Sequence, residues 1–199
     1  MSRPAIDVSP LPSYAFGHRS LMWWGTLGMM AIEGTVFALA IASYFFLRGR
    51  ADEWPIGAHP PFLFWGTLNT ILLLASSVPN QLAKRAAERL DLPKVQLWLF
   101  VCLAFGVAFI VVRAYEFTTL NIWWDQNAYG SLIWVLLGLH TTHVVTDVAD
   151  TAVLTVLMVT GPIDESRFVD VSENALYWYF VLIAWLPIYA VIYFAPRMG

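Results

Sequence analysis

Five long apolar stretches dominate this sequence of 199 residues and constrain its fold more than any other feature. An α-helix rises about 1.5 Å per residue, so about twenty apolar residues cross the roughly 30 Å hydrocarbon core of a bilayer. Membrane spans are either helices or closed barrels, and barrel strands are short and strictly alternating. These stretches are of helical length and do not alternate, so they predict an all-α integral membrane bundle with five transmembrane helices, over residues 21–47, 62–78, 95–112, 129–159 and 175–195.

The composition supports a membrane environment and excludes other classes of protein. Hydrophobic residues make up 59% of the chain and charged residues 13%, against about 45–50% and 25% in soluble domains. The net charge of -3 offers no basic surface, so we expect no nucleic-acid partner. The single cysteine, Cys102, lies in an apolar run, which indicates an inert packing thiol and excludes an internal disulfide or a cysteine-rich metal cluster.

The segments outside these stretches are short, which predicts one membrane domain over residues 21–195. We expect the first twenty residues to form an exposed cytoplasmic tail, because they lack the apolar core of a signal peptide. Five spans place the tail and the second and fourth connections on one side, together with seven of the eleven Lys and Arg residues. The positive-inside rule then puts the N-terminus in the cytoplasm and the C-terminus outside. The largest basic cluster, KRAAER at 84–89, is interpreted as a topogenic loop on anionic lipid head groups.

Titratable residues inside the spans carry the functional signal, because an ionised side chain at the bilayer centre costs at least about 2.5–3.5 kcal/mol. Glu33 lies near the middle of the first span and requires either a proton or a hydrogen-bond partner inside the bundle. On the fourth span, successive residues advance by about 100°, which gathers one polar stripe on a face turned away from lipid. That stripe consists of His140, His143, Asp147, Asp150 and Thr151.

Three interpretations of this stripe remain open. A metal site would use His140, His143, Asp147 and Glu33, although the sequence holds no second Glu-x-x-His copy to complete a di-metal cage. A proton path would use the two histidines and the acids at depth. The third interpretation, which we favour, is an interhelical hydrogen-bond network that holds the first and fourth spans together.

The histidines are too few and too clustered for a chain that holds haems and copper by itself. His18 and His59 fall in the tail and in a loop, whereas His140 and His143 share one span. We therefore expect this chain to bind no metal and no redox cofactor of its own.

Four segments resemble, in order, subunit III of the haem-copper oxidases, the cytochrome c oxidase subunit III family. The family's Glu-bearing helix and its next helix are similar to WWGTLGMMAIEGTVFALAIASYFF and PPFLFWGTLNTILLLASS. Its aromatic-Glu-aromatic loop and Gly-x-His-x-x-His-Val helix are similar to RAYEFTTLNIWWDQNAYGSLIWVLLGLHTTHV, and its last helix to ENALYWYFVLIAWLPIYAVIYF. Together these segments cover residues 21–194, and as a set they are specific.

The resemblance implies an accessory subunit of a respiratory cytochrome c oxidase in the bacterial plasma membrane. Such a subunit binds no haem or copper, since these belong to its partner subunits. It packs against the catalytic subunit I and lies near subunit II. It also holds structural phospholipid and supports proton uptake by the catalytic subunit.

The resemblance also implies roles for individual residues. Glu33 is the counterpart of the family's intramembrane carboxylate, and its expected partner is His143. Arg113 and Glu116 are expected to form an ion pair at the outer surface, with a solvated contact of little energy as the alternative. Aromatic anchors at the membrane interface are expected at Trp123, Trp124 and Tyr129.

Departures from the family pattern leave other identities open. The full-length family has seven spans, and the present chain matches it from the third onward. Tyr179 and Leu182 stand where the family usually has His and an acid, and Arg113 stands where Gln is common. A subunit of a quinol oxidase or of a nitric oxide reductase is therefore an alternative. Alternatives of other classes are a metal-dependent membrane enzyme and a self-standing small-solute or proton transporter, although the sequence shows no inverted repeat.

Overall fold

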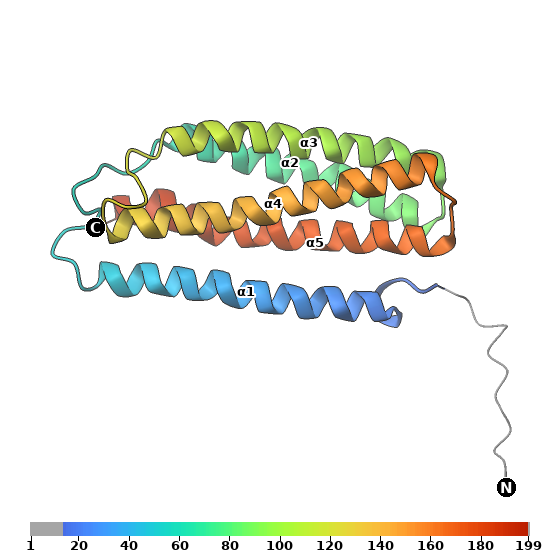
Figure 1. Ribbon diagram of the computed structural model, residues 1–199, viewed down its shortest axis with the longest axis horizontal. Helices are drawn as coiled ribbons and strands as arrows, with labels where there is room; N and C mark the ends of the chain where they lie inside the picture. The colour runs from blue at the N-terminus through green and yellow to red at the C-terminus, as the bar shows by residue number, and fades with distance from the viewer. Residues whose placement is uncertain (1–13, 199) are drawn as a thin grey trace, which may run out of the picture.

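The computed structural model describes residues 14–198 and consists of one bundle of long α-helices (Figure 1). No strand occurs among the described residues. A short 3₁₀ turn, Gly17–Arg19, precedes the first helix. The helices are α1 (Leu21–Arg48), α2 (Leu63–Glu88), α3 (Leu92–Thr118), α4 (Ala128–Thr160) and α5 (Glu165–Tyr189). The expected all-α five-helix membrane bundle is thereby confirmed, and the first thirteen residues of the expected tail lie outside the described part of the chain.

Polar side chains at the helix starts explain where three of the helices begin. Ser20 accepts a hydrogen bond from the backbone N–H of Met22, and so caps α1. The side chain of Asp91 caps α3, and that of Asn127 caps α4 by accepting from Gly130 N–H. Each of these side chains satisfies a backbone donor that has no partner within its helix.

Of the described helical segments, α1, α3, α4 and Glu165–Arg197 are long and apolar enough to cross a membrane. The helix α2 is equally long but less apolar, because polar residues interrupt its apolar run. Two of these, Asn69 and Ser76, are buried and hydrogen-bond to Glu116 and Trp178 of neighbouring helices. The polarity of α2 therefore reflects contacts inside the bundle rather than exposure to water.

Two helices extend past the limits that hydropathy suggests. The second span was expected over residues 62–78, but the helix α2 runs on through Pro79 to Glu88. Likewise α5 begins at Glu165 rather than at residue 175. The helices are longer than the expected spans because an apolar run marks the part of a helix that lies in lipid, whereas polar residues continue the same helix beyond it.

The chain departs from regular α-helix just beyond α5, which contains Pro187 near its end. A proline removes one backbone N–H donor from the helical ladder. Beyond it, Ala190–Phe194 adopts a wider π-helical turn before the 3₁₀ turn Ala195–Arg197. This turn contains Tyr193, which points into the bundle and is buried.

The helix α1 lies at the edge of the bundle, against α4 and α5, whereas α2 and α3 form the opposite side (Figure 1). Only Phe37 and Tyr44 of α1 are buried, and both lie in its C-terminal half. Trp54 in the loop after α1 donates a hydrogen bond to the Tyr44 hydroxyl over 2.8 Å. The N-terminal half of α1 contributes no buried residue, so α1 is attached to the bundle mainly by one half.

Candidate functional site

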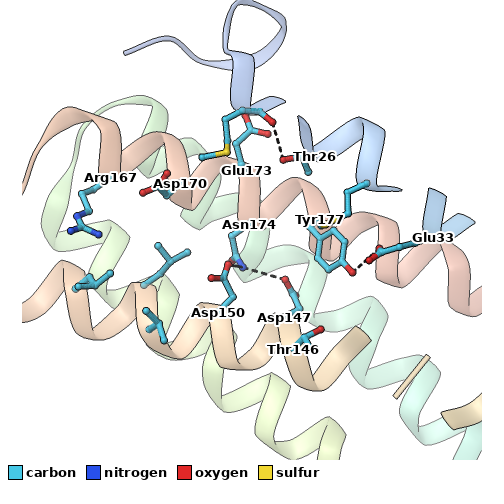
Figure 2. Close-up of a pocket in the computed structure, with 15 residues that line it drawn as sticks. Thr26, Glu33, Thr146, Asp147, Asp150, Arg167, Asp170, Glu173, Asn174 and Tyr177 are labelled. Carbon is cyan, nitrogen blue, oxygen red and sulfur yellow. Dashed lines mark hydrogen bonds between the residues drawn. The ribbon is translucent and has the colours of Figure 1, made fainter. Parts of the chain in front are cut away.

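Glu33 in the middle of α1 finds partners on both neighbouring helices. Its Oε2 accepts a hydrogen bond from the Tyr177 hydroxyl of α5 over 2.8 Å, and its Oε1 lies 3.5 Å from His143 Nε2 of α4. Figure 2 shows the carboxylate and the Tyr177 hydroxyl pointing toward one another. We call Glu33, His143 and Tyr177 the Glu33 cluster. It places the acid beside His143, the histidine that the resemblance suggested.

The hydrogen bonds of His143 fix where its ring proton lies. Nδ1 is 2.7 Å from the carbonyl oxygen of Leu139, which can only accept, so Nδ1 carries a hydrogen. In neutral His143, Nε2 is then a bare acceptor that faces a carboxylate oxygen of Glu33. The ring is thereby oriented with Nε2 toward the Glu33 carboxylate, so the pair joins α1 to α4 in the middle of the bundle.

His140 belongs to a different set of contacts, although it lies on the same side of α4. Its Nε2 lies 3.1 Å from the Val181 carbonyl oxygen of α5, and its Nδ1 lies 3.4 Å from an Arg113 Nη2 of α3. A neutral ring that donates to Val181 accepts from Arg113, so both ring nitrogens are satisfied without charge on the imidazole. The two histidines of the polar stripe therefore belong to different clusters.

The expected ion pair of Arg113 and Glu116 is present, with 3.0 Å between Nη1 and Oε2. Its expected place at the outer surface is wrong, because both side chains are 1% exposed and lie inside the bundle. Glu116 also accepts hydrogen bonds from Asn69 over 2.5 Å and from the Tyr193 hydroxyl. The Arg113 guanidinium lies over the Trp185 ring at 4.1 Å.

The physical reason for this burial lies in the neighbours of α3. Asn69 on α2 and Tyr193 in the π-helical turn supply two donors for the Glu116 carboxylate, which offsets its loss of water. Gly66, one turn before Thr70 on α2, leaves room for the Tyr193 ring, since a Cβ at Gly66 would overlap that ring. We call Arg113, Glu116, Asn69, Tyr193 and His140 the Arg113 cluster.

The two aspartates of α4 meet an amide from α5. The Asn174 side-chain nitrogen lies 3.2 Å from Asp147 Oδ1 and 3.1 Å from Asp150 Oδ2, and Asn174 Oδ1 accepts from the Thr151 hydroxyl. Figure 2 shows Asn174 reaching from α5 toward both carboxylates. This bridge links α4 to α5. The polar stripe of α4 therefore contacts α5 through Asn174, in addition to its contact with α1 through Glu33.

A cavity of about 530 Å³ lies between the N-terminal half of α1, the C-terminal half of α4 and the N-terminal half of α5. We call it the α1 cavity. Met22, Thr26, Met29 and Glu33 line it from α1, on one face of that helix. The lining from α4 and α5 includes Asp147, Asp150, Arg167, Asp170, Glu173, Asn174 and Tyr177 (Figure 2). The cavity therefore extends from one end of the bundle to the Glu33 cluster.

The metal-site interpretation is not supported by this geometry. His140 turns toward Arg113 and Val181, away from Glu33, so the four proposed ligands do not converge. Among residues 14–198, no group of three or more His, Cys, Asp or Glu side chains is arranged to hold a metal ion.

The expected interface aromatics differ in their surroundings. Trp123 and Trp124 are largely exposed in the connection before α4, as an anchor at the membrane surface requires. Tyr129 is fully buried, and its ring packs edge-on against Trp54 with 5.2 Å between centroids. The expectation that Tyr129 is an interface anchor was therefore wrong, because the loop after α1 covers it.

Several residues of the site were not anticipated from the sequence. Tyr177 and Tyr193 resemble the aromatic residues of ordinary lipid-facing positions, and only the packing of α5 turns their hydroxyls toward Glu33 and Glu116. Asn69 and Asn174 carried a clearer signal, because an amide side chain near an apolar run needs a partner inside the bundle.

Comparison with known proteins agrees with this architecture. The family model described as cytochrome c oxidase subunit III matches residues 26–196. A cytochrome c oxidase subunit 3 of Corynebacterium diphtheriae is 30% identical over 198 residues, with 94% of each chain covered. A cytochrome c oxidase subunit 3 of Thermostichus vulcanus is 26% identical over 193 residues, with 92% of each chain covered. A probable cytochrome c oxidase subunit 3 of Mycobacterium bovis is 31% identical over 179 residues, with 85% of this chain and 86% of the relative covered.

The family match covers most of the chain, from within α1 to beyond α5, and the relatives from Thermostichus vulcanus and Corynebacterium diphtheriae are matched over 92% and 94% of each chain. The chain therefore belongs to the cytochrome c oxidase subunit III family and is subunit III of a haem-copper oxidase.

Proposed function

We propose that this subunit III stabilises the catalytic subunit of its oxidase and supports proton uptake, without a redox centre of its own. Subunits of this family carry no redox centre, so the haems and copper belong to partner subunits. The observation that carries the proposal is the Glu33 cluster, in which a carboxyl group in the middle of α1 meets an imidazole and a hydroxyl at the wall of the α1 cavity. The direct partner is subunit I, and subunit II is a further neighbour.

The outer surface of α1 supports a role in binding lipid. Ile32, Leu39 and Phe46 are exposed and seven residues apart, so they share one face of the helix. In this proposal, the acyl chains of a structural phospholipid pack along this face. Mass spectrometry of the purified complex after detergent exchange tests the proposal. We expect a bound phospholipid in the wild-type complex and its loss when Leu39 is replaced by Asn.

The distribution of cations supports the proposed orientation in the bacterial plasma membrane. Lys84, Arg85, Arg89 and Lys94 lie around the connection from α2 to α3, at the same end of the bundle as the start of α1 (Figure 1). Arg113 is no longer counted among the charges on the other side of the membrane, because it is buried in its pair with Glu116. The positive-inside rule therefore favours a cytoplasmic N-terminus.

Purification tests the subunit assignment within the proposed complex. The chain is expected to leave the membrane with haem-bearing partners in a mild detergent that keeps respiratory complexes intact. Whole-complex mass spectrometry with a haem spectrum identifies the partners, and it distinguishes a cytochrome c oxidase from a quinol oxidase or a nitric oxide reductase. Recovery of the chain alone under these conditions contradicts the proposal, and solute transport by the purified chain in vesicles favours a transporter instead.

Proton uptake is tested on the assembled oxidase. Glu33→Ala removes the carboxyl from the Glu33 cluster, and we expect oxidase activity to decline during sustained turnover. Glu53→Gln, in the loop after α1 and outside the cavity, is the matched control with the loss of one acid. Equal turnover and equal proton uptake in both variants and the wild type contradict a role for Glu33.

A further inference from the structure

Tyr177 connects the Glu33 cluster to the α1 cavity. Tyr177 and Glu33 both line this cavity, whereas His143, the other partner of Glu33, is not among the lining residues. The Glu33 side chain is 23% exposed and that of His143 is 13% exposed. The Glu33 carboxyl therefore has one partner at the cavity wall and another away from the cavity, between α1 and α4.

The two oxygens of the Glu33 carboxyl differ in how closely they are held. Oε2 accepts a hydrogen bond from the Tyr177 hydroxyl over 2.8 Å, an ordinary length for such a bond. Oε1 lies 3.5 Å from His143 Nε2, which exceeds the usual range of about 2.7–3.2 Å. Tyr177 therefore makes the shorter of the two contacts and fixes one side of the carboxyl group.

Tyr177 also supplies the hydrogen-bond donor of the cluster. Because the Nδ1 hydrogen of His143 is directed at the Leu139 carbonyl oxygen, a neutral His143 presents a bare Nε2 and donates nothing to Glu33. Among residues 14–198, the Tyr177 hydroxyl is then the one group that donates a hydrogen bond to the Glu33 carboxyl. Without this hydroxyl, the carboxyl group has no donor to set its rotation about the last side-chain bond.

Packed aromatic rings hold both partners of Glu33 in place. Tyr177 packs against Phe180 of the same helix, with 5.7 Å between ring centroids. The Phe37 ring of α1 lies 6.3 Å from Phe180 and 5.0 Å from His143, again between centroids. Phe37 follows Glu33 by one helical turn and shares its face of α1. Rings from three helices therefore set the separation of the two groups that the carboxyl meets.

We propose that Tyr177 is a positioning residue for Glu33. Its hydroxyl holds Oε2 at the wall of the α1 cavity, which keeps Oε1 directed at His143. This role rests on the proposed function of Glu33 in proton uptake, and it identifies the side chain that orients the carboxyl for that function. A hydroxyl that only packs α5 against α1 would be the contrary result.

Variants of the intact oxidase complex in lipid nanodiscs test this role. Tyr177→Phe removes the hydroxyl and keeps the ring that packs against Phe180. Tyr179→Phe is the matched control, because it removes a hydroxyl of the same helix that donates to Gln81 of α2 rather than to Glu33. A third complex carries 3-fluorotyrosine in place of Tyr177, which keeps the hydroxyl and makes it a stronger donor, since fluorine withdraws electrons from the ring.

The infrared bands of the Glu33 carboxyl, identified by difference against Glu33→Gln, report its hydrogen bonds directly. We expect these bands to move in one direction in Tyr177→Phe and in the opposite direction with fluorotyrosine, and to stay unchanged in Tyr179→Phe. Activity during sustained turnover should be lost roughly two- to tenfold faster in Tyr177→Phe than in the wild type, which corresponds to one net hydrogen bond. Haem content and subunit composition confirm that each complex is intact.

Three results overturn this role of Tyr177. Unchanged Glu33 bands in both the Phe and the fluorotyrosine complexes show that the hydroxyl does not position the carboxyl, and the fluorotyrosine complex decides this alone if Tyr177→Phe does not assemble. An equally fast loss of activity in Tyr179→Phe indicates a general packing effect of the α5 hydroxyls. Wild-type turnover in Tyr177→Phe beside a loss of activity in Glu33→Ala leaves the function of Glu33 standing without Tyr177.

Failure of the proposed function itself gives a different result. Glu33→Ala then sustains turnover and proton uptake like the wild type, and no function remains for which Tyr177 could orient the carboxyl. Any shift of the Glu33 bands in Tyr177→Phe would in that case describe a structural contact only.

Discussion

Arg113 Nη1 lies 3.0 Å from Glu116 Oε2 in the interior of the bundle, and no more than 1% of either side chain is exposed. A buried pair of this kind contributes little net stability, because burying two charges costs about as much as their attraction returns. Its consequence is specificity of packing, since each charge is tolerated only beside the other. The pair therefore fixes how the end of α3 sits against α2 and the π-helical turn.

Removal of one member of this pair is expected to destabilise the bundle strongly. Glu116→Gln leaves Arg113 buried without a counter-charge, and the free energy of unfolding should fall by about 3–5 kcal/mol. The double variant Arg113→Gln with Glu116→Gln removes both charges and should lose much less. Unfolding in mixed micelles measures both variants. Additive losses in the double variant would contradict a coupled buried pair.

Glu33→Gln should leave assembly nearly intact. Its amide oxygen accepts from the Tyr177 hydroxyl, and its amide nitrogen donates to the bare Nε2 of His143, so both contacts of the Glu33 cluster survive. Glu33→Ala removes both contacts and should lower stability by about 1–3 kcal/mol. Recovery of subunit III with the oxidase after detergent purification compares the two, and equal recovery would show that Glu33 does not hold α1 in place.

Gly106 allows close approach of α3 and α4. A Cβ at this position would lie 2.5 Å from Val148 Cγ2, and the branched Val side chain has little freedom to move. Gly106→Ala should therefore destabilise the bundle by about 1–3 kcal/mol. Gly138→Ala is the matched control on α4, because its Cβ meets nothing within 4 Å. Thermal unfolding of the purified complex measures both, and equal midpoints would contradict tight packing at Gly106.

Asp91 gives a pH dependence that can be measured at the α2–α3 connection. A hydrogen bond from the Lys94 ammonium lowers the pKa of the Asp91 carboxyl below its ordinary value. A lowered folded-state pKa means that the ionised carboxylate stabilises the fold above the unfolded-state pKa of about 3.9, and that this contribution is lost as pH falls through the folded-state pKa.

Asp91→Asn isolates this effect, because asparagine caps a helix as well as aspartate does. The difference in stability between wild type and Asp91→Asn should be present at neutral pH and should vanish in acid. Unfolding of both proteins over a pH series measures it. A constant difference at every pH would exclude the charge on Asp91 as its source.

Much of the fold followed from hydropathy and local chemistry. The apolar stretches predicted five helices, and Glu33 was expected to need a partner inside the bundle, because an ionised acid is costly in the bilayer. The resemblance to subunit III, and not hydropathy, suggested that this partner is His143. Hydropathy did not give the full lengths of α2 and α5, because an apolar run marks the part of a helix in lipid and polar residues continue the helix beyond it. The surroundings of Arg113, Glu116 and Tyr129 were missed as well, because each depends on a segment distant in the sequence that covers it.

His140 and His143 illustrate which features follow from the sequence and which depend on the tertiary structure. Three residues along a helix correspond to about 60° around its axis, so both histidines lie on one side of α4. The sequence by itself determined that this side faces the protein, because charged and polar groups avoid lipid. The family resemblance suggested His143 as the partner of Glu33, but only the tertiary structure showed that His143 turns to α1 while His140 turns to Arg113 on α3. Within a packed bundle, 60° is enough to turn one side chain toward one neighbouring helix and the next toward another.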